Sequence, residues 1–130
     1  MILGIGTDLV EIGRIEAALE RWGERFARRI LVPRELDRLA RHRKPAAYLA
    51  KRFAAKEAFS KAMGTGIHAP VSWQNIGVVN HASGRPMLEL SAPLAALVAR
   101  RGVRSVHVSL TDERGMAAAF VVLEGESGAG

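Results

Sequence analysis

The pattern of hydrophobic and polar positions changes early in the chain. Residues 2–9, ILGIGTDL, alternate apolar side chains with small or polar ones, which is typical of a β-strand with one buried face. From Ile12 to Ile30 the apolar residues recur at spacings of three and four, which predicts a helix that buries one side. The chain is therefore expected to begin with a strand and a helix.

Two prolines mark the starts of two further helices. Pro33 opens the segment PRELDRLARH, and Pro45 opens PAAYLAKRFAAKEAFSKAM, which is rich in alanine and other strong helix formers. Gly64 follows the second segment directly, where a left-handed residue can close a helix. We therefore expect a short helix and then a long one that ends at Gly64.

Beyond Trp73 the period becomes that of strands. NIGVVN and PMLELS flank HASGR, and SVHVSL and MAAAFVVLE flank TDERG, so each pair predicts a β-hairpin. Between the hairpins, APLAALVARRG predicts a helix closed by Gly102. The whole pattern indicates an α+β fold, in which an antiparallel sheet of three or more strands packs on one long helix.

Length and composition limit the class of protein. The 130 residues, 48% of them apolar, predict a single domain over residues 1–123 and a disordered tail over 124–130 that contains GESGAG. No apolar run reaches the roughly 18 residues of a membrane span. The first residues include Asp8 and Glu11 and no basic region, unlike a signal peptide, so a cytoplasmic protein is expected. Without cysteine, disulfides, thiolate metal sites and a cysteine nucleophile are excluded.

The net charge of +6 suggests an anionic partner, which could be nucleic acid, a nucleotide, a membrane surface or an acidic protein. Aromatic residues make up only 5% of the chain, which argues against a stacking platform for single-stranded nucleic acid. Basic runs such as RHRK and RRGVR still support a nucleic-acid-binding module as an alternative. That alternative leaves Asp8 and Glu57 unexplained, because carboxylates repel phosphate unless a metal lies between them.

The predicted long helix carries Phe53, Glu57 and Lys61 at spacings of four, so they form one stripe. The stripe can be an apolar position followed by an ordinary Glu–Lys surface pair. It can also place a metal ligand, Glu57, one turn from a cation that neutralises phosphate, Lys61. Magnesium suits the second interpretation, because it takes one or two carboxylates and leaves its other positions to water and phosphates. The segment 64–66, GTG, would then let a phosphate or ribose approach the backbone closely.

Two other positions are ambiguous by themselves. Asp8 is either a site residue or the N-cap of the helix that begins near Glu11. In the strand VHVSL, His107 and Ser109 share one face and their apolar neighbours take the other. A histidine there can be structural, but its polar neighbour on the same face favours contact with a ligand.

Three segments together resemble a known family. GIGTDLVEI at the N-terminus, FAAKEAFSKAMGTGI in the middle and HVSLTDERGMAAAFVV near the C-terminus resemble the holo-acyl-carrier-protein synthases, the small bacterial phosphopantetheinyl transferases. The resemblance extends from Met1 to about Leu123. Many relatives have Ser-His where this chain has Thr111-Asp112, which leaves the role of these two residues open.

The resemblance implies a magnesium-dependent transferase. It would move phosphopantetheine from coenzyme A to a serine of apo acyl carrier protein, giving holo carrier protein and adenosine 3',5'-bisphosphate. The implied magnesium ligands are Asp8 and Glu57, and with Lys61 they form the implied catalytic set. The residues assigned to the coenzyme A site are Phe53, Lys61, Gly64, Thr65, Gly66, His107 and Ser109. The acceptor of the serine proton stays open between Glu57, Asp8 and a metal-bound water.

The small members of the family are homotrimers with each active site between two subunits. This implies that Asp8, Glu57 and Lys61 come from one subunit, and His107 and Ser109 from its neighbour. It also favours a carrier protein, rather than nucleic acid or a membrane, as the anionic partner.

The first predicted helix offers a docking face for that partner. At about 100° per residue, one line along the helix carries Arg14, Ala18, Arg21, Arg25 and Arg28. The apolar positions, Trp22 among them, centre roughly 120° away. The face is either solvated, with pairs such as Glu24 with Arg28, or it binds an acidic partner. Acyl carrier proteins resemble such a partner, being acidic helical bundles, and the family docks them on this helix.

Overall fold

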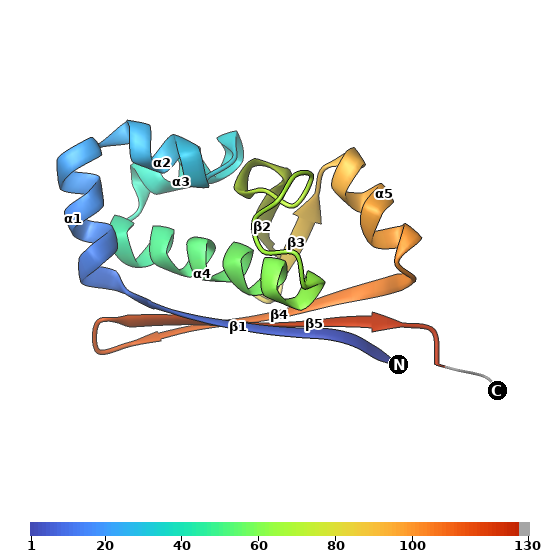
Figure 1. The fold of residues 1–130 in the computed structure, drawn as a ribbon. Helices are drawn as coiled ribbons and strands as arrows, with labels where there is room; N and C mark the ends of the chain where they lie inside the picture. Colours follow the sequence, from blue (N-terminus) through green and yellow to red (C-terminus); the bar gives the residue numbers. More distant parts are fainter. Residues whose placement is uncertain (128–130) are drawn as a thin grey trace.

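The computed structural model describes residues 1–127, and in it a three-stranded antiparallel sheet lies beneath a layer of helices and a small hairpin (Figure 1). The elements in chain order are β1 (Ile2–Glu11), α1 (Ile12–Trp22), α2 (Glu24–Ile30), α3 (Pro33–Arg41), α4 (Pro45–Met63), the 3-10 helix η1 (Trp73–Asn75), β2 (Ile76–Asn80), β3 (Pro86–Leu90), α5 (Ala92–Arg100), β4 (Val103–Glu113) and β5 (Met116–Gly125). The predicted α+β fold, with an antiparallel sheet on one long helix, is confirmed. None of the helices within residues 1–127 combines the length and apolar character that crossing a membrane requires.

The larger sheet has the strand order β1–β5–β4 and is antiparallel throughout. Side chains alternate between its two faces, so Asp8 and Val10 of β1 point toward α4. The opposite surface, which we call the outer face, carries Ile5, Leu9 and Phe120, which are 57%, 65% and 44% exposed. An apolar strip is therefore left uncovered on the outer face.

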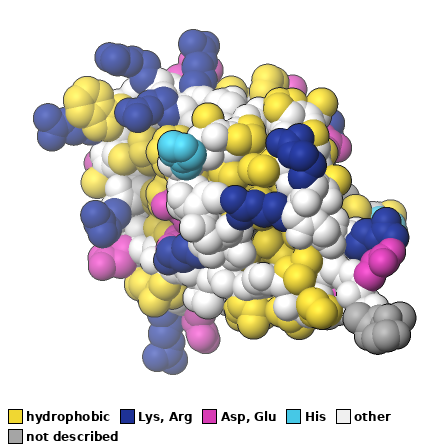
Figure 2. All heavy atoms as spheres, turned by 45° about the vertical axis from the view of Figure 1, so that its right-hand side comes forward, with side chains coloured by type: hydrophobic (Ala, Val, Ile, Leu, Met, Phe, Trp, Pro, Cys, Tyr) yellow, Lys and Arg dark blue, Asp and Glu magenta, His cyan; other side chains and the backbone are white. Residues whose placement is uncertain are grey.

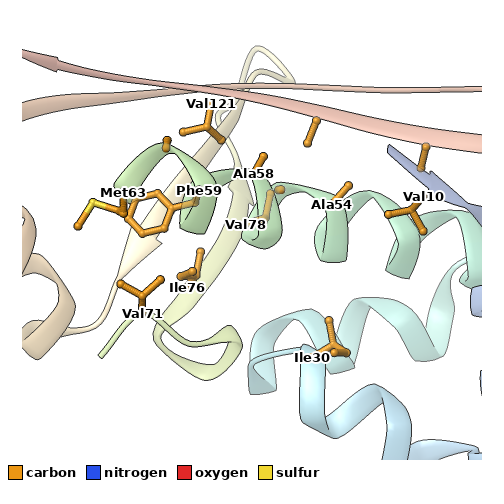
Figure 3. Packing of buried hydrophobic residues seen from close by; sticks show 14 of the residues in the cluster. Val10, Ile30, Ala54, Ala58, Phe59, Met63, Val71, Ile76, Val78 and Val121 are labelled. Atoms are coloured by element: carbon orange, nitrogen blue, oxygen red, sulfur yellow. The ribbon is translucent and has the colours of Figure 1, made fainter. Parts of the chain in front are cut away.

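Helix α4 forms the centre of the core, between the large sheet and the β2–β3 hairpin (Figure 3). At Gly4 and Gly6 the backbone of β1 lies directly against the backbone of α4. A Cβ added at Gly6 would lie 1.9 Å from the carbonyl oxygen of Ala58, and one added at Gly4 would lie 2.1 Å from that of Ala62. Only glycine permits this approach, and the small alanine side chains of α4 keep the helix close to the strand.

The prediction of one helix from Ile12 to Ile30 is wrong. The chain breaks at Gly23, which has φ 58° and ψ −137° and separates α1 from α2. The Gly23 N–H donates to Leu19 O at 2.8 Å and ends α1. Apolar spacing continues across the break because both helices bury one side, so the period alone does not show it. Trp22, predicted on the buried side, is 50% exposed.

Two strand ends also differ from the predicted ones. β5 continues to Gly125, whose N–H donates to Met1 O at 2.8 Å, so the first two residues of the predicted tail belong to the sheet. β4 extends to Glu113, and the turn between β4 and β5 is reduced to Arg114 and Gly115, both with positive φ. Residues 128–130 of the predicted tail lie outside the described residues.

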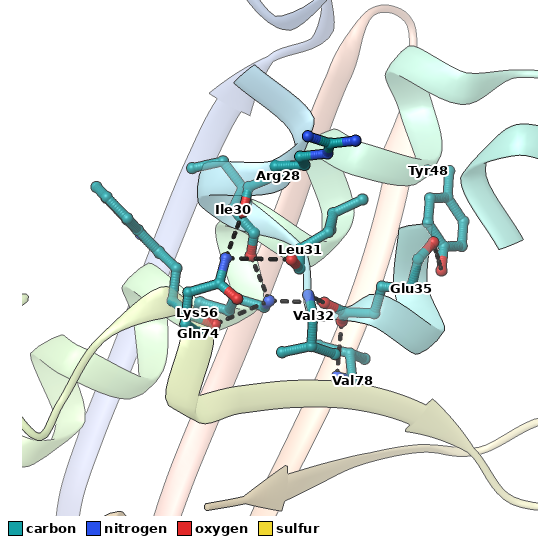
Figure 4. A network of polar contacts seen from close by, with 10 residues as sticks. Arg28, Ile30, Leu31, Val32, Glu35, Tyr48, Lys56, Gln74 and Val78 are labelled. Carbon is teal, nitrogen blue, oxygen red and sulfur yellow. Dashed lines mark hydrogen bonds and ion pairs between the residues drawn. The ribbon is translucent and has the colours of Figure 1, made fainter. Parts of the chain in front are cut away.

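A buried ion pair joins α4 to α3 (Figure 4). Lys56 is fully buried, and its Nζ lies 2.7 Å from Glu35 Oε1 and also donates to the carbonyl oxygens of Ile30 and Trp73. The second oxygen of Glu35 accepts the Val78 N–H at 2.8 Å. Burial lowers the pKa of Lys56 below its ordinary value, and the Glu35 carboxylate opposes part of that effect. The network fixes the end of α2, η1 and β2 to the long helix.

Candidate functional site

A cavity of about 520 Å³ lies between the end of β1, the α1–α2 pair and the middle of α4. Asp8 and Glu57, the two acids singled out in the sequence, both line it. Phe53 and Arg14 line it as well, and Glu11 contributes a third acid. The structure thus brings the predicted metal ligands into one cavity from distant parts of the chain.

Asp8 reaches the cavity because it lies on the α4 side of β1, where it pairs with Ala119 of β5. Its side chain is 15% exposed, and its Oδ1 accepts a hydrogen bond from Lys61 Nζ at 3.0 Å. The same lysine donates to Thr7 O at 3.0 Å. Asp8 is not the N-cap of α1, since that position belongs to Glu11, which makes no side-chain capping bond.

Glu57 lies in the middle of α4, one turn after Phe53. Its Oε2 accepts a hydrogen bond from Trp73 Nε1 at 3.1 Å, a contact that the sequence interpretation missed. Within residues 1–127 the ion pair of Lys61 is with Asp8 and not with Glu57. The alternative of an ordinary Glu–Lys surface pair along α4 is therefore not what the structure contains.

The two carboxylates are suited to a metal that binds together with its substrate. In residues 1–127 no group of three or more His, Asp or Glu side chains is placed to hold a metal ion. Mg²⁺ takes one or two carboxylates and completes its octahedral shell with waters and substrate phosphates. Asp8 and Glu57 therefore fit Mg²⁺ beside a phosphate group, and Lys61 adds a positive charge at the same place.

The segment Gly64–Thr65–Gly66 follows α4 at the lysine end of the stripe. Gly64 and Gly66 have φ values of 76° and 64°, and a Cβ at either would meet nothing within 4 Å. Their backbone is thus open to a ligand. The Thr65 and Gly66 N–H groups both donate to Ser60 O, so these N–H groups are used within the turn.

His107 and Ser109 lie on the outer face of the sheet, away from the cavity. Ser109 pairs with Phe120 of β5, whereas Asp8 pairs with its neighbour Ala119, which points to the opposite face. The His107 side chain is hydrogen-bonded to Glu124, with 2.9 Å between Nε2 and Oε1. This hydrogen bond lowers the pKa of Glu124 below its ordinary value. Within one chain, the sheet separates these two residues from the carboxylates.

The predicted arginine face is split by the break at Gly23. Arg14 and Arg21 lie on α1, and Arg25 and Arg28 lie on α2, so they do not follow one helical line. Arg14 lines the cavity that holds the carboxylates. The expected pair of Arg28 with Glu24 is present at 3.4 Å and is exposed.

A second hollow of about 700 Å³ adjoins this cavity, with Ala18 and Phe26 lining both. Arg25, Arg28 and Trp22 also line it. Figure 2 shows basic side chains gathered around hydrophobic surface at the upper left, the α1–α2 end of the molecule. A mixed basic and apolar surface therefore leads to the carboxylates.

Asp112, whose role the sequence left open, pairs with Lys51 of α4 at 3.2 Å and ties the end of the β4–β5 hairpin to the helix. Thr111 is exposed.

The sequence also contained a sign, which the interpretation missed, that Lys56 is buried. Lys56 is seven residues from both Leu49 and Met63, which are buried. This spacing places Lys56 on a buried stripe of α4.

Comparison with known proteins shows which family this chain belongs to. Residues 4–121 match the model of the 4'-phosphopantetheinyl transferase superfamily. The chain is 53% identical over 124 residues to the holo-[acyl-carrier-protein] synthase of Nitrosomonas europaea, covering 95% of this chain and 99% of that protein. It resembles the crystal structure of the synthase from Neisseria meningitidis, with TM-score 0.92, 47% identity and coverage of 95% and 99%. It also resembles the Bacillus anthracis synthase in complex with CoA (3',5'-ADP), with TM-score 0.81, 38% identity and coverage of 97% and 99%. The chain belongs to the 4'-phosphopantetheinyl transferase superfamily and, within it, to the holo-[acyl-carrier-protein] synthases.

Proposed function

We propose that the chain transfers phosphopantetheine from coenzyme A to a serine of apo acyl carrier protein in a magnesium-dependent reaction, leaving adenosine 3',5'-bisphosphate. The observation that carries the proposal is the meeting of Asp8, Glu57 and Arg14 at one cavity, with Lys61 bonded to Asp8. A nucleic-acid-binding module gives no reason for paired carboxylates at a basic surface. The cytoplasmic location expected from the sequence is part of the same proposal.

The residues of the cavity have separate tasks in this reaction. Asp8 and Glu57 would hold Mg²⁺, which supplies Lewis-acid polarisation of the pyrophosphate. Lys61 places a fixed cation 3.0 Å from Asp8 and stabilises the negative charge that grows on the leaving phosphate. The serine oxygen bonds to the pantetheine-bearing phosphorus, the bond to the adenosine-bearing phosphate breaks, and that phosphate keeps the electron pair. The serine proton passes to a base, for which Asp8 and Glu57 are candidates.

We propose further that the protein is a homotrimer with each active site between two subunits. The support is the outer face, where Ile5, Leu9 and Phe120 form an exposed apolar strip next to His107 and Ser109. A neighbour that covers this strip would bury it. The same contact would bring His107 and Ser109 to the edge of the neighbour's cavity, where they could hold the nucleotide part of coenzyme A.

The carrier protein is proposed to dock on the α1–α2 end. Arg25 and Arg28 line the hollow that adjoins the carboxylate cavity, and Arg14 lines the cavity itself. Arg21 has its guanidinium 4.9 Å from the centre of the Trp22 ring, and Trp22 lines the same hollow as Arg25 and Arg28. An acidic helical partner seated on these four arginines would place its serine within reach of Asp8 and Glu57.

Mass spectrometry of an apo carrier protein incubated with coenzyme A and MgCl₂ tests the proposal. The expected result is a mass gain of one phosphopantetheine group, which disappears when EDTA removes the metal. Asp8→Asn and Glu57→Gln should each lose most of this activity and keep a wild-type thermal unfolding curve, because neither residue belongs to the core cluster. If the wild-type protein adds no mass, and an oligonucleotide raises its melting temperature where coenzyme A does not, the proposal is wrong.

A further inference from the structure

We propose that Trp73 is a positioning residue, whose indole N–H holds the Glu57 carboxylate in the orientation that binds the divalent cation. The inference rests on the proposed function, because it takes Glu57 to be a metal ligand. It concerns a residue that lies outside the carboxylate cavity and acts on it through one hydrogen bond.

In the contact between Trp73 and Glu57, the indole is the donor and the carboxylate is the acceptor. The distance from Trp73 Nε1 to Glu57 Oε2 is 3.1 Å, and an indole nitrogen can only donate, so the carboxylate oxygen accepts. Glutamate has several rotatable bonds, and a bond at one oxygen fixes the direction in which the other oxygen points. The ring of Phe53, one turn earlier on α4, lies 6.2 Å from the Trp73 ring and limits the movement of the indole.

The backbone of Trp73 is held as firmly as its side chain. Its carbonyl oxygen accepts a hydrogen bond from the buried Lys56 Nζ at 3.1 Å, and Lys56 is itself paired with Glu35 at 2.7 Å. The next residue of η1, Gln74, donates to Leu31 O at 3.1 Å. Trp73 is thus attached to two consecutive residues of α4, to Lys56 through its main chain and to Glu57 through its side chain.

Each of the two carboxylates accepts a hydrogen bond at one of its oxygens. Lys61 donates to Oδ1 of Asp8, and Trp73 donates to Oε2 of Glu57. Among the contacts of residues 1–127, Asp8 Oδ2 and Glu57 Oε1 accept no hydrogen bond. Each acid therefore has one oxygen fixed by a donor and one oxygen left for a cation, which is the arrangement of metal ligands supported by outer hydrogen bonds.

Trp73→Phe tests the inference, because it keeps an aromatic ring beside Phe53 and removes the N–H donor together with the pyrrole half of the indole. Loss of an outer hydrogen bond to a metal ligand typically weakens metal binding by 10-fold to 100-fold. We expect the apparent Mg²⁺ constant of the transfer reaction to rise about 10-fold. The Michaelis constant for carrier protein should not change. Isothermal titration of MgCl₂ into the coenzyme A-saturated proteins should show the same weakening without any turnover.

A second measurement, of tryptophan fluorescence, uses a protein in which the Trp73 indole is intact. The chain has two tryptophans, so Trp22→Phe leaves Trp73 as the only one. Titration of this protein with MgCl₂ in the presence of coenzyme A should change the Trp73 emission, and adding Glu57→Gln should remove the change. An emission that does not respond to MgCl₂, while calorimetry shows binding, contradicts the inference and does so even if Trp73→Phe fails to fold.

The outcomes separate this inference from the proposed function. If the wild-type protein needs Mg²⁺ and Trp73→Phe has the same Mg²⁺ constant, Trp73 has no positioning role and the proposed function stands. A loss of activity that follows a lower melting temperature, with an unchanged Mg²⁺ constant, shows a structural role only and also overturns the inference. If the wild-type protein neither binds nor needs Mg²⁺, both proposals fail.

Discussion

A methyl group added at Gly6 would lie 1.9 Å from the carbonyl oxygen of Ala58 and 2.6 Å from the backbone nitrogen of Ala62. Ordinary contacts of a Cβ begin at 3.4 Å, so in Gly6→Ala the strand β1 and the helix α4 must separate by about 1.5 Å, the difference between 3.4 and 1.9 Å. Both contacted atoms belong to the backbone. No side-chain rotation can therefore relieve the overlap, and the helix itself has to move.

This movement should cost more in activity than in stability. Overpacking a core typically costs about 1–3 kcal/mol, out of the roughly 5–15 kcal/mol by which a domain is stable, so the protein should still fold. Asp8 is two residues beyond Gly6, and Glu57 directly precedes Ala58, so the shift passes straight to the distance between the carboxylates. A misplacement of about 1 Å can reduce a rate by about 100-fold, and Mg²⁺ demands near-ideal geometry.

We therefore expect the turnover number of Gly6→Ala to fall about 100-fold or more, with a melting temperature lower by roughly 3–15 °C. Transfer measured by mass spectrometry and thermal unfolding followed by circular dichroism give the two quantities. Gly13→Ala is the matched control, because it adds the same methyl group on α1 where nothing lies within 4 Å. It should keep wild-type activity and an equal or higher melting temperature. Wild-type turnover in Gly6→Ala would refute the argument that this approach sets the spacing of the site.

Three further predictions concern assembly, docking and pH. A mixture of inactive His107→Ala and inactive Glu57→Gln proteins should recover part of the activity after subunit exchange, because some interfaces then contain both intact groups; a monomer in sedimentation, or no recovery, contradicts a shared site. Arg14→Glu and Arg21→Glu should raise the Michaelis constant for carrier protein, most strongly at low salt, and leave that for coenzyme A nearly unchanged; a parallel rise in both constants would place docking elsewhere. The hydrogen bond from His107 lowers the pKa of Glu124 from its ordinary 4.5, so the pair stabilises the fold above that pH, and its contribution is lost as pH falls through the folded-state pKa. In His107→Ala, an NMR titration should show that the pKa of Glu124 returns toward 4.5. An unchanged pKa would assign the shift to another cause.

Local signals predicted the long helix well. Pro45 begins α4 and Gly64, with φ 76°, closes it as expected, because both residues act through their own backbone dihedral angles. The break at Gly23 was not predicted, because it depends on how the two helices pack in the tertiary structure. A glycine inside an apolar period permits a break without requiring one. Trp22 is the last residue of α1, directly before the break, and its side chain is exposed.

The site was predictable only in part, for a similar reason. Asp8 and Glu57 were paired through a resemblance and not through their spacing, since no local pattern brings the end of a strand to the middle of a later helix. The Trp73 contact with Glu57 was missed because it depends on how η1 folds back on α4. His107 carries no sign in the sequence that the sheet separates it from the carboxylates of its own chain.

The buried pair of Lys56 and Glu35 has a consequence for how this sequence can change. The lysine uses its three protons on Ile30 O, Glu35 Oε1 and Trp73 O, and the glutamate also accepts the Val78 N–H. Replacing either residue alone leaves an uncompensated charge in the core, which typically costs about 3–5 kcal/mol, a large share of a domain's stability. Replacing both still leaves the Ile30 carbonyl group and the Val32 and Val78 N–H groups without these partners. Positions 35 and 56 should therefore change together or not at all among relatives, and any lineage that changed them must also have rebuilt the end of α2 and the start of β2.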